Sequence, residues 1–234
     1  MLRSFLNRYQ PQLVLLPSLI VITITVYGFI AFTTLLSFSG SKMFPNLSRF
    51  VGFEQYARLF QNPRWIVAID NFFIFGVLYV GLASLIGLVL AILLDQKIRA
   101  EGALRTIYLY PMALSFIVTG VAWQWLMSPD LGLEKAFHIW GWQEFRFNWI
   151  KDDTMAIYCV VIAGVWQAAG FVMALFLAAL RGINPEILSA ARIDGATPFQ
   201  TYRHVVLPTL RPAVMTAFVV QGHLAIKSYD LVVA

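Results

Sequence analysis

The sequence predicts an all-α polytopic membrane protein, and three observations support that fold class. Hydrophobic residues make up 59% of the chain and charged residues only 12%, whereas soluble domains average about 25% charged residues. A helix of roughly 20 apolar residues crosses a hydrocarbon core of about 30 Å. Four uncharged runs reach that length, over residues 9–41, 71–94, 106–129 and 154–180, and a shorter fifth covers 212–226. We therefore expect five transmembrane helices, and the composition excludes a soluble fold.

The first run has two interpretations. It follows Arg3 and Arg8, as the apolar core of a signal peptide would. It is, however, much longer than the ~7–15 apolar residues of a signal peptide, and no clean cleavage site follows it. We interpret it as an uncleaved first transmembrane helix.

Two segments are expected outside the membrane on the same side. Residues 52–60 place three aromatic side chains and a leucine on one helical face, which predicts a short amphipathic helix at the membrane interface. Residues 128–153 are rich in Trp and Phe, which are typical anchors at a membrane boundary. Binding of an extracytoplasmic partner is the alternative role for these aromatic residues.

Signatures of an enzyme are absent from the sequence. It contains no H-E-x-x-H, G-x-S-x-G or P-loop motif, and His138, His204 and His223 lie far apart without the spacing of metal ligands. We therefore expect no catalytic residues, no metal and no cofactor. The net charge of +5 is better explained by Lys and Arg retained in inner loops than by nucleic-acid binding.

The segment 181–212 is too polar to span a bilayer, but it carries clear helix-end signals. Asn184 suits an N-cap and Pro185 the first helical position. Gly195 can end the helix in a left-handed conformation. These signals predict a helix over residues 185–194.

A second set of signals follows directly. Thr197 and Gln200 have the capping-box spacing, and the second helix should stop near Leu207 and Pro208, because the residue before a proline avoids the helical region. A ten-residue helix is marginal in water by itself, so the first helix must pack on something. It either rests on lipid or on its own bundle, or it inserts its small apolar surface into a cytosolic partner.

These residues resemble a known signature. Ser189-Ala-Ala-Arg-Ile-Asp-Gly-Ala196, followed by Leu207-Pro208 and Pro212, resembles the E-A-A-x-x-D-G-A…L-P-x-x-x-P pattern of the permease subunits of bacterial binding-protein-dependent ABC importers. Ser189 stands in place of the family's first acidic residue, with Glu186 three residues earlier. Further segments resemble the carbohydrate branch, most closely the glucose- and mannose-type permeases, at residues 94–99, 105–115 and 226–232.

The resemblance implies a mechanism. In this family the loop, here residues 185–206, is a coupling helix that docks on a separate cytosolic ATPase, so this chain would not hydrolyse ATP itself. The residues implied in coupling are Glu186, Ser189, Ala190, Ala191, Asp194, Gly195, Ala196, Leu207 and Pro208. A cytoplasmic loop places the N-terminus inside as well. That orientation gives nine Lys and Arg in inner segments against seven in outer segments, in the direction of the positive-inside rule.

The resemblance also implies partners, location and domain organisation. We expect a multi-pass protein of the bacterial inner membrane that works with a second permease subunit, an extracytoplasmic sugar-binding protein, a sugar and membrane lipid, but with no nucleic acid. Residues 1–70 would form an N-terminal helix and outer segment, and residues 71–234 the permease domain with its coupling loop at 181–212. Family members usually have a sixth helix, so we expect a C-terminal truncation after the fifth.

The fifth helix carries ionisable residues. Lys227 and Asp230 are three residues apart, which would place them on one helical face where they partly neutralise each other. They lie either at the outer interface or along the sugar pathway, because intramembrane ionisable groups tend to line cavities. Aromatic and amide side chains suit sugars, so the candidate pathway residues are Trp123, Gln124, Trp166, Gln167, Gln221, Tyr229, Lys227 and Asp230.

The predicted function is therefore the permease subunit of a sugar-importing ABC transporter. The first alternative is a secondary transporter or channel that needs no ATPase, which the loop signature disfavours. The second is a membrane-anchored structural or assembly factor. Polar residues inside the predicted spans, Gln124, Gln167 and Gln221, disfavour a purely structural bundle.

Overall fold

The computed structural model describes residues 14–41, 44–96, 98–129 and 131–233. Arg3, Arg8 and the start of the first uncharged run lie outside the described residues. The chain divides into two compact units, Met1–Ile69 and Asp70–Ala234. The described residues are helical apart from turns, loops and one isolated antiparallel bridge between Ser39 and Phe50, and they contain no strand, which agrees with the predicted all-α class.

The first unit contains a long apolar helix and a short one. The helix Val14–Ser37 is long and apolar enough to cross a membrane, and none of it is buried; it includes a π-helical turn η1 (Thr23–Tyr27) and α2 (Gly28–Ser37). The predicted amphipathic helix is present as α3 (Glu54–Phe60). The Tyr56 hydroxyl donates to the Ser37 hydroxyl at 2.7 Å, which joins α3 to the end of α2.

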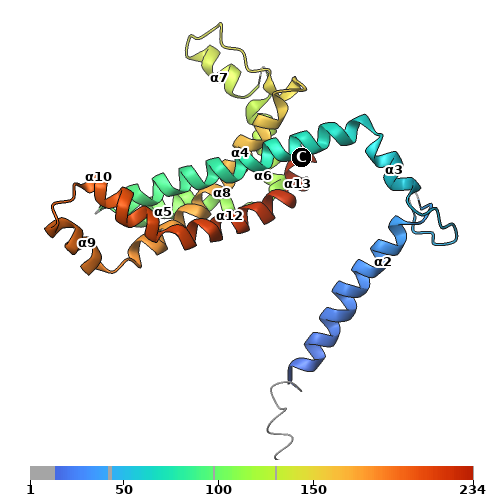
Figure 1. Ribbon diagram of the computed structural model, residues 1–234. Helices are drawn as coiled ribbons and strands as arrows, with labels where there is room; N and C mark the ends of the chain where they lie inside the picture. Colours follow the sequence, from blue (N-terminus) through green and yellow to red (C-terminus); the bar gives the residue numbers. More distant parts are fainter. Residues whose placement is uncertain (1–13, 42–43, 97, 130, 234) are drawn as a thin grey trace, which may run out of the picture. The chain divides into compact units, whose positions relative to one another are not determined.

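The second unit is a helical bundle (Figure 1). α4 (Pro63–Leu94) enters it from the first unit. The elements that follow are α5 (Glu101–Leu109), η2 (Tyr110–Ala113), α6 (Phe116–Met127), α7 (Leu133–Ile139), η3 (Trp149–Lys151), α8 (Ala156–Arg181), α9 (Pro185–Ile193), α10 (Pro198–Thr201), η4 (Tyr202–Val206), α11 (Leu207–Thr209), α12 (Arg211–Ile226) and α13 (Tyr229–Val233).

The five predicted spans take two forms. Three described helices, Val14–Ser37, Pro63–Leu94 and Ala156–Arg181, are continuous and long enough to cross a membrane. The other two are bent pairs: Glu101–Ala113 with Phe116–Met127, at 101°, and Pro198–Thr209 with Arg211–Ile226, at 59°. The prediction of five spans therefore holds only when each bent pair counts as one span.

The third span was wrongly predicted as one uninterrupted helix. Leu114 is extended, with ψ 146°, and the Ser115 hydroxyl caps the new helix by accepting from the Val118 amide at 3.3 Å. The physical reason for the bend is local, because Pro111 removes one backbone donor and a serine N-cap starts a fresh helix. Arg105, which directly precedes the third uncharged run, lies within α5.

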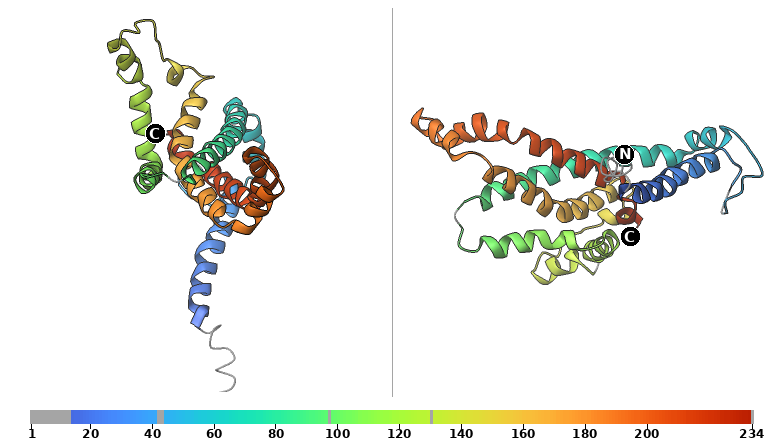
Figure 2. Two further views of the ribbon diagram at one scale, coloured as in Figure 1. Left: turned by 90° about the vertical axis from the view of Figure 1, so that its left-hand side faces the viewer. Right: turned by 90° about the horizontal axis from the view of Figure 1, so that it is seen from below.

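α8 is the central helix of the bundle, and 67% of its most apolar window is buried. Figures 1 and 2 show α4 and α12 running along it. Two glycines allow close approach of its neighbours. A Cβ at Gly87 of α4 would lie 2.7 Å from Val172, and a Cβ at Gly170 of α8 would lie 1.8 Å from the Tyr108 carbonyl oxygen of α5. Lipid gives little hydrophobic drive for helices to associate, so this close packing contributes much of the cohesion.

The second span, α4, packs on the bundle through a face of small residues. Ala83 and Ala91 are fully buried, and Gly87 lies between them against α8. Small side chains at four-residue spacing let two helix backbones approach. The contact fixes the side of α4 that faces the bundle interior.

The N-terminal end of α8 is held by a capping carboxylate. Asp152 accepts hydrogen bonds from the hydroxyl and amide of Thr154 and from the amide of Met155. These donors, the Thr154 hydroxyl first, hold the pKa of Asp152 below its ordinary value. The start of the helix therefore gains an anionic partner, which its dipole favours.

The fifth span ends earlier than predicted. α12 stops at Ile226, Lys227 caps it, and the chain turns before α13 begins at Tyr229. The prediction that Lys227 and Asp230 share one helical face is wrong, because a turn interrupts the 3.6-residue period between them. Among the ion pairs found in the described residues, none joins these two side chains.

Candidate functional site

Two regions of the second unit combine unusual geometry with chemical specialisation. The first is the two-helix loop, residues 181–212, at one end of the bundle (Figure 1). The second, the polar cavity, is a mostly apolar space among α4, α8, α12 and the bend between α5 and α6, named for the polar side chains that also line it. Each is built from residues singled out in the sequence, together with others that were missed.

The first helix of the loop forms as predicted. The Asn184 side chain accepts from the Glu186 amide at 2.9 Å, Pro185 occupies the first turn, and α9 ends at Ile193. Gly195 follows with φ +77°, a conformation that costs most other residues energy. The Ala196 amide then donates back to the Ala191 carbonyl oxygen at 3.0 Å. That bond is typical of a left-handed helix end.

The second helix also begins as predicted but ends later. Thr197 and Gln200 form a complete capping box. The helix then widens into the π-helical turn η4 and continues through Pro208 to Thr209. The stop predicted near Leu207 and Pro208 is therefore displaced to the 59° bend that precedes α12.

α9 presents two different faces. Ala191 and Leu188 face the bundle, and Ala191 is 9% exposed. On the other side, Ala190 is exposed and Ile193 is 86% exposed; Phe199, just after the second helix begins, is 72% exposed. Apolar side chains presented at the tip of a polar loop are typical of a surface that docks on another protein.

The residues with a predicted coupling role mostly lie on this exposed surface. Exposed side chains or positions are found at Glu186, Ser189, Ala190, Asp194, Gly195, Leu207 and Pro208, whereas Ala196 is partly buried and Ala191 is buried. The Ser189 hydroxyl donates to the Pro185 carbonyl oxygen at 2.9 Å, and the Glu186 carboxylate accepts from the Asn184 amide at 3.3 Å. Both polar groups are therefore engaged inside α9.

Ile193 and Phe199 were missed by the sequence reasoning. They fall outside the fixed letters of the motif, at variable positions. Their exposure combined with their size is the signal that identifies them, and exposure is visible only in the structure.

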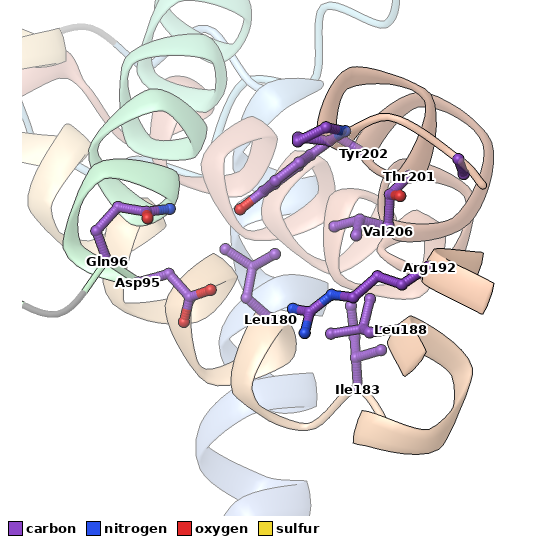
Figure 3. A pocket seen from close by; sticks show the side chains of 11 residues that line it. Asp95, Gln96, Leu180, Ile183, Leu188, Arg192, Thr201, Tyr202 and Val206 are labelled. Atoms are coloured by element: carbon purple, nitrogen blue, oxygen red, sulfur yellow. The ribbon is translucent and has the colours of Figure 1, made fainter. Parts of the chain in front are cut away.

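A cavity of about 750 Å³ separates the loop from the bundle (Figure 3). Arg192 extends into it from α9, Asp95 and Gln96 from the end of α4, and Tyr202 from η4 (Figure 3). The loop therefore contacts the bundle mainly through its ends, where Ile183, Val206 and Leu210 are buried.

Arg181 joins three spans at the base of the loop. Its guanidinium donates to Glu101 at the start of α5 at 2.7 Å and lies 3.7 Å from Asp95 at the end of α4. The positive charge also sits at the carboxyl end of α8, where the helix dipole favours it. The loop thus leaves the bundle where ion pairs of Arg181 connect the ends of α4, α5 and α8.

The polar cavity inside the bundle has a volume of about 520 Å³, within the range of about 300–1,000 Å³ typical of small-molecule sites. Three of the predicted pathway residues, Gln167, Gln221 and Asp230, line it together. They come from α8, α12 and α13. Tyr79 of α4 and Ser115 at the start of α6 also line it and were not predicted.

Two hydrogen bonds fix the amide groups in this cavity. Gln167 Nε2 donates to the Leu114 carbonyl oxygen at 2.7 Å, and the Tyr79 hydroxyl donates to Gln221 Oε1 at 3.3 Å. The opposite atoms, Gln167 Oε1 and Gln221 Nε2, are buried without a partner among the described residues. A buried polar atom left unpaired costs about 1–3 kcal/mol, and neither of these two atoms has accessible surface at which a ligand in the cavity could reach it.

The remaining predicted pathway residues lie elsewhere. Trp123 and Trp166 pack against each other edge to face, with ring centroids 5.8 Å apart, and border an apolar groove of about 580 Å³. Gln124 lines a smaller cavity of about 200 Å³. Lys227 is exposed, and the side chain of Tyr229 lies outside the described residues. The aromatic pair is therefore separate from the amide pair.

Comparisons with known proteins agree on one family. Residues 83–233 match the family model described as binding-protein-dependent transport system inner membrane component. A probable ABC transporter permease protein of Pyrococcus horikoshii is 38% identical over 221 residues, covering 94% of this chain and 76% of the relative. The xylose/arabinose import permease protein of Haloferax volcanii is 32% identical over 218 residues, covering 92% and 68%.

A solved structure confirms the fold. The crystal structure of a bacterial ABC transporter involved in the import of the acidic polysaccharide alginate matches with a TM-score of 0.78 at 22% identity, covering 94% of this chain and 74% of the matched chain. At that identity the match concerns the fold.

Proposed function

The chain belongs to the family of binding-protein-dependent transport system inner membrane components, and we propose that it is the permease subunit of an ABC importer that carries a sugar across the cytoplasmic membrane. The observation that carries this proposal is the two-helix loop, capped at Asn184 and Thr197 and turned at the left-handed Gly195. Its exposed apolar tip suits docking on a separate subunit, which would be a cytosolic ATPase. The names of curated relatives, which include import permeases for xylose/arabinose and for trehalose/maltose, support a sugar as the transported solute.

Three partners complete the proposed transporter. They are ATPase subunits in the cytosol, a second permease subunit in the membrane and an extracytoplasmic sugar-binding protein. A matched structure was solved in complex with an alginate pentasaccharide-bound periplasmic protein, which supports a delivery step of the same kind here. The glucose- or mannose-type specificity expected from the sequence stays a prediction.

The orientation and domain roles belong to the same proposal. A loop that docks on a cytosolic ATPase must face the cytoplasm. An even number of membrane spans between the N-terminus and the loop places both on the same side of the membrane. With four spans before the loop, the N-terminus is cytoplasmic. We assign residues 71–234 as the permease domain and residues 1–70 as the N-terminal helix and outer segment.

The site residues divide between docking and solute contact. The motif positions from Glu186 to Ala196, with Leu207 and Pro208, are assigned to docking, and we add Ile193 and Phe199 because of their exposure. Gln167, Gln221 and Asp230 are assigned to solute contact, with Tyr79 added because its hydroxyl orients Gln221. Roles for Trp123, Gln124, Trp166, Lys227 and Tyr229 along the solute path stay predictions.

The test is reconstitution of the permease pair, the ATPase and the binding protein in proteoliposomes, with ATP supplied on the loop side. We expect uptake of a labelled sugar that requires ATP and all four components. A double substitution at the loop tip, Ile193→Ser with Phe199→Ser, should weaken association with the ATPase while the permease still inserts. Uptake that proceeds without ATP, or association unaffected by the double substitution, would contradict the proposal.

A further inference from the structure

The apolar groove bordered by Trp123 and Trp166 has a volume of about 580 Å³ and draws its walls from α4, α5, η2, α6 and α8. Among the described residues that line it, the polar side-chain groups are the Tyr108 hydroxyl and the two indole N–H groups. The third span bends by 101° between η2 and α6, and side chains on both sides of that bend line the groove. The bend therefore shapes the groove.

The groove lies in the stretch of the bundle that crosses the membrane. Leu82 and Leu90 bound it on α4, and Val161 and Gly170 bound it on α8; both helices are long and apolar enough to span a bilayer. Leu82 and Ile86 are 39% and 40% exposed, so the lining is accessible from outside the bundle. Water finds few hydrogen-bond partners in an apolar space of this kind. Apolar matter, from the membrane or from another protein, must therefore fill it.

The dimensions of the groove favour an acyl chain over a helix. Its bounds on α4 and α8 are eight and nine residues apart, or about 12 and 14 Å along each helix. A helix that crosses the membrane covers about 30 Å. A helical segment about 12 Å long and 10 Å wide would also occupy about 900 Å³, which exceeds the volume of the groove. A narrow, flexible hydrocarbon chain fits the space better.

A sugar is a poor occupant of the same groove. A hydroxyl group that moves from water into an apolar space without a hydrogen-bond partner costs free energy, and the lining offers few such partners. The amide side chains that could supply them lie elsewhere, because Gln124 and Gln167 line other cavities. The two tryptophan rings alone do not make a sugar site.

Positive charge lies at the loop side of the groove. α5 begins at Glu101, which Arg181 binds at the base of the loop, and Arg105 lies one turn before the groove residue Tyr108. Arg99 and Arg105 are exposed, and neither takes part in an ion pair found among the described residues. Basic residues beside the ends of membrane helices attract anionic lipid headgroups. The charge therefore complements a phospholipid whose chain enters the groove.

We propose that this groove binds an anionic phospholipid, with one acyl chain along Trp123 and Trp166 and the headgroup at Arg105 on the loop side. The groove supplies apolar contact along the chain, and Arg105 supplies the preference for a negative headgroup. The site goes beyond the proposed import function, because it depends on the membrane-spanning bundle and not on the transported solute.

The experiment measures phospholipid binding to the detergent-purified transporter by native mass spectrometry, during titration with phosphatidylglycerol or phosphatidylcholine. We expect phosphatidylglycerol to bind about fivefold more tightly, the preference that one basic side chain near the headgroup gives. Arg105→Gln should abolish this preference, and Arg203→Gln, at an exposed position in the loop, should retain it. Equal affinity for the two lipids in the wild type would overturn the assignment of the headgroup.

Filling the groove tests the acyl chain. Leu82→Trp should weaken phosphatidylglycerol binding at least about tenfold, the effect of displacing two methylene groups. Ile162→Trp fills the groove from α8 and repeats the test independently, with thermal unfolding to establish that each variant is folded. Val77→Trp, at a position of α4 that is 70% exposed and outside the groove, should bind lipid as the wild type does. Equal binding in all three variants would overturn the proposal.

The same variants distinguish other occupants. Loss of the second permease subunit from Leu82→Trp, with phospholipid binding unchanged, would make the groove a subunit interface and overturn the proposal. Displacement of the bound phospholipid by xylose or maltose would return Trp123 and Trp166 to the solute path and would also overturn it. The expected result is that Leu82→Trp loses the phospholipid and keeps its sugar binding.

Discussion

The two-helix loop and the polar cavity lie in the same unit, but they are specified in different ways. The features that shape the loop are local: the Asn184 cap, the left-handed Gly195 and the Thr197–Gln200 capping box all lie within residues 184–200. The cavity instead depends on Tyr79, Ser115, Gln167 and Gln221, which come from four helices. Local hydrogen bonds specify the loop, whereas close helix packing specifies the cavity.

The difference implies that the two regions should fail differently. A change in the loop should uncouple the protein from its ATPase and leave the bundle folded. A change in the packing that shapes the cavity should destabilise the bundle, and a change in the cavity lining should affect the solute alone.

Gly195→Pro should abolish ATP-driven uptake while the protein still inserts in the membrane. Gly195 has φ +77°, whereas proline is confined near −65°, so the turn between α9 and α10 cannot form. Co-purification with the ATPase, followed by uptake, measures the effect. The matched control is Gly102→Ala in α5, where a Cβ meets nothing within 4 Å; it should retain both activities. Wild-type uptake in Gly195→Pro would show that the turn is unnecessary.

Gly170→Ala should destabilise the bundle by about 3 kcal/mol or more, at the upper end of the cost of overpacking. Its Cβ would lie 1.8 Å from the Tyr108 carbonyl oxygen, and a backbone atom cannot yield as a side chain can. Thermal unfolding in detergent measures the loss. Gly76→Ala, in α4 with open space around the Cβ, is the control. Equal stability of the two variants would contradict the packing account.

Gln221→Leu should weaken sugar binding by about tenfold, the equivalent of 1.4 kcal/mol, with a small change in stability. It removes a buried donor that has no protein partner, which offsets the lost hydrogen bond from Tyr79. Direct binding and thermal unfolding should be compared with Gln61→Leu, an exposed position outside the cavity. A large loss of stability with unchanged sugar binding would make Gln221 a structural residue.

Arg181→Gln should have the smallest effect, about 0.2–1 kcal/mol on stability, because its ion pairs are partly exposed. Arg181 stands where the loop joins the bundle, so it tests whether the two regions are independent. A double-mutant cycle with Glu101→Gln measures the coupling energy of the pair at 2.7 Å. We expect the ratio of sugar-stimulated to basal ATPase activity to fall further than stability does. A change in stability alone would limit Arg181 to a structural role.

The loop, which local hydrogen bonds specify, could be predicted from sequence more completely than the cavity, which packing between distant helices specifies. The loop was predicted nearly to the residue, because caps and left-handed glycines are encoded over three or four positions. Its end was displaced from Pro208 to Thr209 because a π-helical turn, η4, carried the helix past the proline. The bend at Leu114 and the turn at Lys227 were missed, since continuous hydrophobicity conceals a break in a helix.

The cavity could be predicted only in part. Gln167 and Gln221 were identified because amide side chains within an apolar span can hydrogen-bond to a sugar. Tyr79 was not identified, because a single tyrosine in an aromatic-rich apolar span is not distinguished from its neighbours by sequence. The Trp123–Trp166 pair was grouped with the amides by residue type, but it packs in a different groove. Only the three-dimensional packing separates residues that share a chemistry from residues that share a site.

The central claim, that this permease moves a sugar when an ATPase acts through the loop, is tested most directly by one measurement. Labelled-sugar uptake is followed in proteoliposomes that contain the complete transporter, with wild-type protein and Gly195→Pro side by side, with and without ATP on the loop side. The account predicts ATP-dependent uptake in the wild type and none above background in Gly195→Pro. Uptake that is independent of ATP, or equal in the two proteins, would contradict it.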